Sequence, residues 1–216
     1  VNRQLDCDVL QNQNPGSSTS AYDGLVPESC NRLVGPSYAL LRPQFAHARE
    51  NMVVREHGIN RVLITMGGTD PFQQTAKVLK ATGLLGEVDL HLDVVISSDS
   101  PDLDDLQKMV GCLPHTVTLH QSVQDMAALM LRADLAIGTS GVTALERCAL
   151  HLPSVLIVVA ENQQVSADAL AASGAAINLG WYEEVTAEQI AAAVNELMHD
   201  REKLGSMQMC AGQLVD

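Results

Sequence analysis

The sequence has few aromatic residues and few positive charges. Aromatics are 3% of the 216 residues, too few for a surface that stacks the bases of single-stranded nucleic acid. Thirteen Lys and Arg against 26 Asp and Glu give a formal net charge of −13, which argues against binding to a phosphate backbone. We therefore expect no nucleic-acid partner. An anionic ligand would have to be held by backbone N–H groups and helix dipoles.

Long apolar runs and paired cysteine motifs are also missing. Hydrophobic residues are 46% of the chain, yet no run approaches the roughly 20 apolar residues of a membrane span. The five cysteines form no CxxC pair and the seven histidines no HExxH motif, so we expect no metal site. Without a signal-peptide pattern, the sequence predicts a cytoplasmic protein with buried free thiols and no membrane contact.

The stretch from 59 to 199 alternates short apolar runs with helical patterns. The predicted strands are 61–66, 92–97, 116–119, 134–137, 154–159 and 175–179. The predicted helices are 72–82, 102–110, 122–132, 142–150, 162–173 and 187–199. This alternation implies right-handed crossovers and a parallel sheet. Six strands in this rhythm predict an α/β fold with a doubly wound parallel sheet of order 3-2-1-4-5-6.

One of these strand-to-helix connections has the pattern of an anion-binding turn. In DLAIGTSGVTALE (134–146) an apolar run stops at Gly138-Thr139-Ser140-Gly141, and a helical pattern follows with Glu146 in its second turn. The first N–H groups of a helix have no intrahelical partner and attract anions. Thr139 or Ser140 can cap the helix or bond a phosphate, and Glu146 can accept from ribose hydroxyls. A turn that merely needs flexibility is the alternative.

A second Gly-rich loop strengthens the nucleotide interpretation. Met66-Gly67-Gly68-Thr69-Asp70-Pro71 follows the first strand, and the predicted order makes the first and fourth strands neighbours at the switch point where ligands bind. The loop after the fifth strand, 160–163, adds polar groups to the same rim. Neither Gly-rich loop matches GxGxxG or GxxxxGK[ST], which disfavours NAD or an ATPase. We expect no cofactor.

Residues 1–58 are organised differently. Segments 7–10 and 32–34 are possible short strands, 35–43 is interrupted by Pro, and 45–57 is a predicted helix. This is too little for an independent domain. We expect residues 1–45 to be the tail and linker of a truncated N-terminal Rossmann-like domain and 46–216 to be the nucleotide-binding domain. Both ends look cut, so we expect a fragment of a longer protein.

Four motifs together carry a family likeness. GPSYALLRPQF (35–45), ITMGGTDP (64–71), ADLAIGTSGVTALERCALHLPSV (133–155) and VVAENQ (158–163) resemble the UDP-sugar hydrolases of the pseudaminic acid pathway. Those enzymes cleave UDP-2,4-diacetamido-2,4,6-trideoxy-β-L-altropyranose and are similar to two-domain GT-B glycosyltransferases. The resemblance implies the C-terminal half of a GT-B fold. It also implies a UDP-sugar in the cleft between the domains, and metal-independent attack of water at the anomeric carbon with inversion.

The resemblance assigns roles to residues of both loops. Glu146 would hold the ribose hydroxyls, and Asn162, the candidate catalytic residue, would reach the reacting sugar or water. The other expected substrate-binding residues lie around the diphosphate and the cleft. They are Thr139, Ser140, Gly141, Val142 and Gln163, together with Gly67, Gly68 and Thr69.

One part of the family pattern is missing. The GxGH loop, whose histidine is the family's expected general base, and a tyrosine near the sugar have no counterpart in these residues. Because such a base is worth about 10²–10⁴ in rate, we expect the 216-residue chain to be inactive or nearly so while still binding UDP weakly. The alternatives are a GT-B glycosyltransferase or epimerase domain, or a non-catalytic nucleotide-binding module.

Structural roles compete for several site residues. Glu146 could be a surface carboxylate paired with Arg147, Asn162 could cap the helix 163–173, and Asp70 is expected to cap the first helix. Tyr38 and Arg42 either contact the ligand or brace the linker.

Other polar and sulfur-containing residues are expected to be structural. Met126, Leu129, Met130 and Ala133 have core spacing. His115 and His120 are expected at the sheet periphery without a function. The acidic cluster of Asp99, Asp102, Asp104 and Asp105 is expected to be a solvated helix start.

Overall fold

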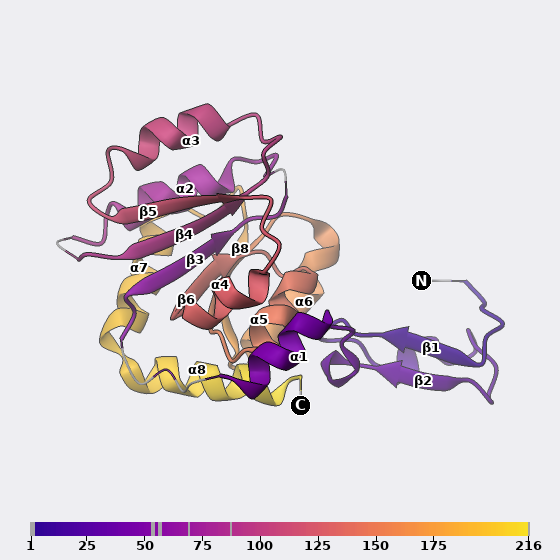
Figure 1. Cartoon of the computed structure of the whole chain (residues 1–216). Helices are drawn as coiled ribbons and strands as arrows, with labels where there is room; N and C mark the ends of the chain where they lie inside the picture. Colours follow the sequence, from indigo (N-terminus) through magenta and orange to yellow (C-terminus); the bar gives the residue numbers. More distant parts are fainter. Residues whose placement is uncertain (1–2, 53–54, 56–57, 69, 87, 216) are drawn as a thin grey trace.

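The protein is built around one six-stranded parallel sheet (Figure 1). The structure, a computed structural model, describes residues 3–52, 55, 58–68, 70–86 and 88–215. The strands are β3 (Arg61–Thr65), β4 (His91–Ile96), β5 (Thr116–Gln121), β6 (Leu135–Gly138), β7 (Ser154–Val158) and β8 (Ala176–Trp181). Their spatial order is β5-β4-β3-β6-β7-β8. The predicted doubly wound order is therefore confirmed.

Helices cover both faces of this sheet. They are α1 (Pro43–Glu50), α2 (Gln74–Thr82), α3 (Leu103–Val110), α4 (Met126–Arg132), α5 (Val142–Ala149), α6 (Glu161–Ala172), α7 (Ala187–His199) and α8 (Arg201–Gln213). Helices α2, α3 and α7 pack on the face that carries Val62 and Ile64, whereas α1 and α4 pack on the face of Leu63. Burial on both faces explains the continuous apolar runs of β3, β6 and β7.

Several helix boundaries differ from the sequence prediction because of local capping. Helix α4 begins four residues late, since Ser122 has φ 51° and Asp125 caps the N–H of Ala128. Helix α1 begins at Pro43, a favoured first position, and ends at Glu50 rather than 57. Residues 53, 54, 56 and 57 of that predicted helix lie outside the described residues. Helix α8, capped by Asp200, was missed.

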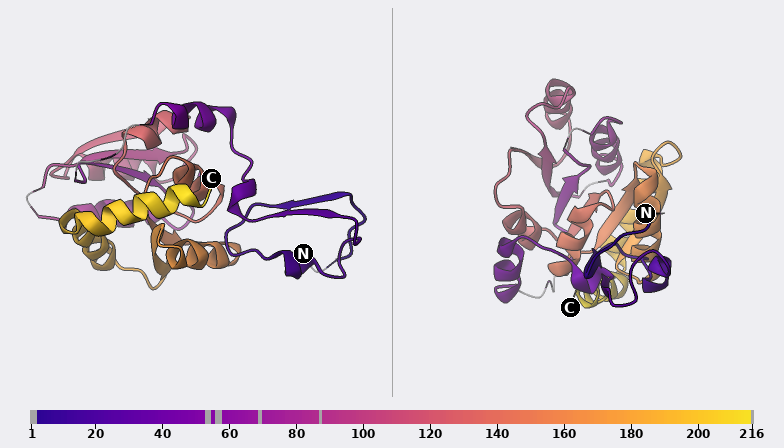
Figure 2. Two further views of the ribbon diagram at one scale, coloured as in Figure 1. Left: turned by 90° about the horizontal axis from the view of Figure 1, so that it is seen from below. Right: turned by 90° about the vertical axis from the view of Figure 1, so that its right-hand side faces the viewer.

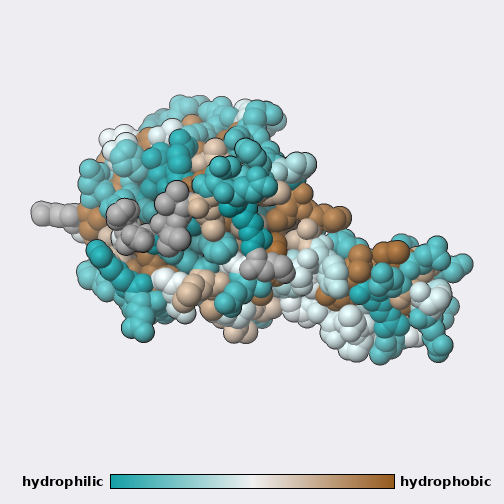
Figure 3. All heavy atoms as spheres, turned by 60° about the horizontal axis from the view of Figure 1, so that its bottom comes forward, coloured by the Kyte–Doolittle hydropathy of each residue, from teal (hydrophilic) through white to brown (hydrophobic). Residues whose placement is uncertain are grey.

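Residues 3–42 form an arm beside the α/β body. Strands β1 (Val9–Asn12) and β2 (Asn31–Val34) make a separate two-stranded parallel sheet, with short 3-10 turns at Thr19–Tyr22 and Pro36–Tyr38. The strand predicted at 7–10 thus begins two residues later. The left view of Figure 2 shows the arm projecting from the body, and Figure 3 shows apolar side chains on the arm and near its junction with the body. The domain boundary near residue 45 remains a prediction.

Candidate functional site

The two Gly-rich turns lie side by side at the carboxyl ends of β3 and β6. These strands pair in parallel, with Thr65 opposite Gly138, as the predicted switch point requires. A pocket of about 260 Å³ opens beside them. It is lined by Arg42, Thr65, Gly67, Gly68, Val95, Ile96, Ser97, Met126, Thr143 and Glu146. The pocket therefore joins the β3 turn, the first turns of α5 and the linker before α1.

Glu146 places its carboxylate in this pocket, although its side chain is only 9% exposed. Its Oε1 accepts two hydrogen bonds from Arg42, at 3.1 Å from Nε and 3.0 Å from Nη2. The expected alternative, a pair with Arg147, is wrong: Arg147 lies on the inner side of the helix and is fully buried. Because both bonds from Arg42 reach Oε1, the second oxygen, Oε2, is left to accept from another group.

Arg42 is the pocket residue whose role could not be decided from the sequence. It is separated from Glu146 by 104 positions, and its guanidinium also lies 5.2 Å from the ring centroid of Phe45. It thus braces the linker and lines the pocket at once. Only the motif GPSYALLRPQF pointed to it, because no local pattern predicts a contact over that separation.

The β6–α5 turn is shaped by close packing. A Cβ on Gly138 would lie 2.6 Å from both the Thr65 carbonyl oxygen and the Nη1 of Arg147, so only glycine fits there. Arg147 donates from Nη2 to the carbonyl oxygen of Thr139 at 2.6 Å. Burial lowers the pKa of Arg147 to about 10, which still leaves it charged at neutral pH.

The start of α5 leaves backbone donors uncapped. The N-cap residue is Gly141, and among the residues that the structure describes no side chain caps the helix. The option that Thr139 or Ser140 caps it is therefore wrong, because the helix begins later than that option requires. Val142 is 57% exposed at the first helical position. The first turn of α5 is thus presented to solvent with free N–H groups.

Ser140 and Gln163 tie the α5 turn to α6. The hydroxyl of Ser140 donates to the Gln163 carbonyl oxygen at 2.8 Å, and the Gln163 side-chain oxygen accepts from Val159 N–H at 3.3 Å. In this arrangement the Ser140 hydroxyl proton is used within the protein, so its remaining contribution to a ligand is its N–H group. The side chain of Gln163 likewise holds the β7–α6 connection.

Asn162 lies exposed in the first turn of α6. The helix begins at Glu161 with Ala160 as its N-cap, so the option that Asn162 caps the helix is wrong. Asn162 is not among the residues that line the described pocket at Glu146.

The β3–α2 turn combines pocket lining with capping. Gly67 has φ 99°, a conformation that glycine adopts without strain, and Gly68 accepts from Ser97 N–H at 3.1 Å. Thr69 lies outside the described residues. Asp70 accepts from the N–H groups of Gln74 at 3.0 Å and Thr75 at 2.6 Å, which confirms its expected role at the start of the first helix.

The residues at core spacing are buried or packed against the core, and one of them, Met126, also lines the pocket. Leu129, Met130 and Ala133 are core residues, and Met126 packs against them while also lining the pocket. His120 bonds Asp93 within the sheet at 2.6 Å. His115 is buried and bonds the Thr82 carbonyl group at 2.9 Å.

Over the described ranges, no group of three or more His, Cys, Asp or Glu residues is arranged to hold a metal ion. The helices within those ranges are all too short or too polar to cross a membrane. The described cysteines are free, but Cys112 is exposed and Cys7 and Cys210 are half-buried, so the expectation of buried thiols holds only for Cys30 and Cys148.

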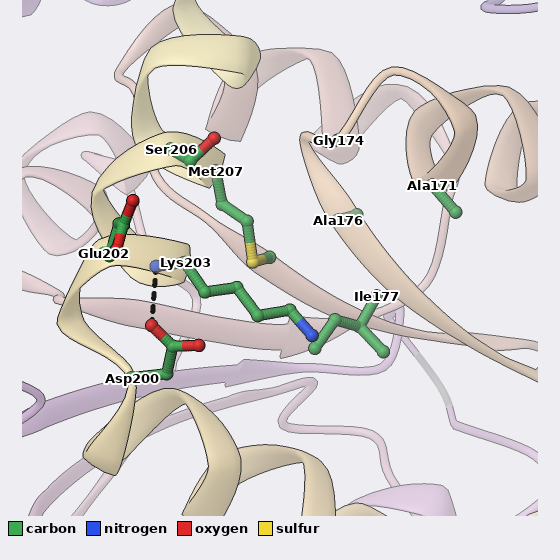
Figure 4. A pocket seen from close by; sticks show the side chains of 9 residues that line it. All are labelled: Ala171, Gly174, Ala176, Ile177, Asp200, Glu202, Lys203, Ser206 and Met207. Atoms are coloured by element: carbon green, nitrogen blue, oxygen red, sulfur yellow. Dashed lines mark hydrogen bonds between the residues drawn. The ribbon is translucent and has the colours of Figure 1, made fainter.

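A wider groove of the described residues lies elsewhere. A groove of about 600 Å³ runs between α8 and the start of β8, at the amino end of that strand (Figure 4). Its lining is Ala171, Gly174, Ala176, Ile177, Asp200, Glu202, Lys203, Ser206 and Met207. Because ligands of open α/β sheets bind at the carboxyl ends of the strands, the smaller pocket at Glu146 is the better candidate.

Known proteins share the sequence pattern and the fold of this chain. Residues 62–214 match the family model of the glycosyltransferase family 28 C-terminal domain. The chain belongs to this family. The structure of Acinetobacter baumannii MurG is similar with a TM-score of 0.71 and 21% identity, over 95% of this chain and 61% of that one. The expected fold, the Rossmann-like C-terminal half of a GT-B protein, is therefore confirmed.

Two curated relatives of this family 28 chain have more specific names. The spore coat polysaccharide biosynthesis protein SpsG of Bacillus subtilis is 32% identical over 165 residues, which are 76% of this chain and 48% of the relative. The UDP-2,4-diacetamido-2,4,6-trideoxy-beta-L-altropyranose hydrolase of Campylobacter jejuni is 33% identical over 172 residues, 78% of this chain and 58% of the relative. The chain thus spans about half the length of these relatives.

Proposed function

We propose that this chain is the UDP-binding half of a nucleotide-sugar hydrolase. The observation that carries the proposal is the pocket at Glu146, where a buried carboxylate stands beside two Gly-rich turns and the uncapped start of α5. A carboxylate that accepts from two ribose hydroxyls, next to free N–H groups for a diphosphate, is the arrangement a nucleoside diphosphate needs.

The proposed roles follow from the positions of the groups. The Oε2 atom of Glu146 accepts from the ribose hydroxyls, while Arg42 holds Oε1. The N–H groups of Ser140, Gly141 and Val142 meet the diphosphate, with Thr139 and Gln163 supporting the turn. Gly67, Gly68 and Thr69 border the cleft near the pyrophosphate.

The proposed reaction is metal-independent hydrolysis with inversion. The oxygen of water bonds to the anomeric carbon of a 2,4-diacetamido-2,4,6-trideoxy sugar as the bond to the UDP oxygen breaks. UDP leaves as an anion, which free N–H groups at a helix start stabilise. Asn162 would orient the water or the sugar. The proton of water passes to a general base, which the family resemblance assigns to an N-terminal domain.

A glycosyltransferase is the second candidate, and one observation favours it. The UDP-N-acetylglucosamine transferase of Anaeromyxobacter sp. is 25% identical over 213 residues, which cover 95% of this chain. In that case an acceptor hydroxyl replaces water at the same carbon. Product analysis of the parent protein with a UDP-sugar distinguishes the two, because only the hydrolase releases free sugar without an acceptor.

Calorimetric titration of the chain tests the binding proposal. We expect UDP to bind, uridine to bind much more weakly, and no hydrolysis of a UDP-sugar by this chain alone. Titration with CDP shows whether the protein distinguishes uracil from cytosine. Absence of UDP binding would contradict the proposed function, and rapid hydrolysis by the 216-residue chain would contradict the assignment of the base to another domain.

A further inference from the structure

The β6–α5 turn is supported from inside the protein by a fully buried guanidinium. Arg147 has no exposed surface, and its Nη2 donates to the carbonyl oxygen of Thr139 at 2.6 Å. In the part of the chain that the structure describes, its Nε and Nη1 have no hydrogen-bond partner. A buried, incompletely paired cation destabilises a folded protein, which favours a functional reason for its presence.

No carboxylate of the described part of the chain bonds Arg147. Its neighbour in sequence, Glu146, points into the pocket and bonds Arg42 instead. Burial lowers the pKa of Arg147 to about 10, so the group stays cationic at neutral pH. A chain with a net charge of −13 therefore keeps one positive charge directly beneath its candidate anion-binding turn.

The bond to Thr139 also sets the direction of the next peptide group. In a trans peptide the C=O of one residue and the N–H of the next point in opposite directions. Because the Thr139 carbonyl points inward to Arg147, the Ser140 N–H points away from the interior. Among the described residues, the N–H groups of Ser140 and Gly141 meet no backbone acceptor.

A second bond fixes the other side of the turn. The Ser140 hydroxyl donates to the Gln163 carbonyl group, so the turn is held from β6 and from α6 at once. The missing Cβ of Gly138 leaves room for the Arg147 guanidinium, whose Nη1 lies 2.6 Å from where that Cβ would be. Donors held in place before the ligand arrives lose little freedom on binding.

We propose that Arg147 is a positioning residue for the diphosphate. It holds the Thr139–Ser140 peptide with the Ser140 N–H facing the ligand, and it places an unpaired positive charge behind that peptide. It does not touch the ligand, because it has no exposed surface. This inference rests on the proposed function, in which the diphosphate lies on this turn.

The variant Arg147→Met separates this role from a purely structural one. Methionine removes the desolvation cost of the buried cation but also leaves the Thr139 carbonyl oxygen without this donor, so UDP binding is compared at a temperature well below the melting transition of both proteins. We expect the Kd for UDP to rise about tenfold or more while weak uridine binding stays unchanged. Arg147→Lys, which keeps the charge, should recover part of the loss. Arg201→Met removes one exposed positive charge in α8 and should leave the Kd unchanged.

Nuclear magnetic resonance of the wild-type chain gives a measurement that does not depend on a variant folding. We expect the amide signals of Ser140 and Gly141 to shift with UDP and not with uridine. If the wild type does not bind UDP, the proposed function and this inference both fail. If the wild type binds UDP but those amides do not shift, or if folded Arg147→Met binds UDP within twofold of the wild type, only the role of Arg147 is overturned.

Discussion

At the residue scale, Glu146 and Arg147 show how neighbours in one helix take opposite environments. Glu146 reaches the pocket and pairs with Arg42 across 104 positions, whereas Arg147 turns inward and is fully buried. The 100° step between successive helical residues separates them. The sequence could identify the carboxylate from its turn, but neither its cationic partner nor the burial of its neighbour follows from local pattern.

Glu146→Gln tests the ribose contact. Loss of a charged acceptor should weaken UDP binding by about 1–3 kcal/mol, measured by calorimetry. Glu202→Gln, at the exposed start of α8, removes the same charge far from the pocket and should leave binding unchanged. Equal affinities for the wild type and Glu146→Gln would remove the ribose assignment.

Asp93 makes stability depend on pH. Burial alone would raise the pKa of Asp93, but hydrogen bonds from Arg61 and His120 outweigh it, and the pKa is lowered overall. A lowered carboxyl pKa adds stability above the unfolded value of about 4, and that stability is lost as pH falls toward the folded pKa. Asp93→Asn should therefore cost about 1–3 kcal/mol at pH 7.

Urea unfolding at several pH values measures this effect. The difference in unfolding free energy between the wild type and Asp93→Asn should narrow as pH falls below about 4. His199→Gln, at an exposed helix end, serves as a control for the method. A difference that stays constant from pH 7 to pH 3.5 would show that the Asp93 charge is not the source of the stability.

At the scale of elements, the β6–α5 turn depends on a glycine. Gly138→Ala places a Cβ 2.6 Å from the backbone oxygen of Thr65, and overpacking of this kind costs about 1–3 kcal/mol. Gly205→Ala is the matched comparison. Gly205 lies in α8, where an added Cβ meets no described atom within 4 Å, and alanine is the better helix former. In thermal unfolding, the melting temperature should fall for Gly138→Ala and rise for Gly205→Ala. Equal changes in melting temperature would contradict the packing argument.

Much of the sheet could be predicted from the sequence, and the reason is physical. Buried parallel strands such as β6 and β7 are continuous apolar runs, and regular alternation with helices leaves few topologies. Other helix starts were harder to predict, because the N-cap positions Asp125 of α4 and Ala160 of α6 depend on local backbone conformation. The site was predicted only in outline, since the Ser140–Gln163 and Arg42–Glu146 contacts arise from tertiary packing.

At the scale of the whole molecule, the arm and the body differ in how they are stabilised. Strands β1 and β2 share a small cluster of Leu10, Val26 and Cys30, and an isolated two-stranded sheet is marginal in water. Strands β3 and β6 lie in the middle of the body. The arm should therefore be less stable than the body.

Hydrogen exchange tests this difference directly. Amides of β1 and β2 should exchange at least about a hundredfold faster than those of β3 and β6. The thiols of Cys7 and Cys30 lie 3.7 Å apart, so oxidation of this pair to a disulfide should slow exchange in the arm without changing the body. Equal protection of the arm and the body before oxidation would contradict the account.

We propose that this chain holds UDP at the carboxyl ends of β3 and β6. The most direct measurement is a map of amide chemical shifts on titration with UDP. We expect shifts concentrated at 65–68 and 138–146, with little change around Lys203 and Met207 in the larger groove of Figure 4. Shifts concentrated in that groove, or no shifts at either place, would contradict this proposal.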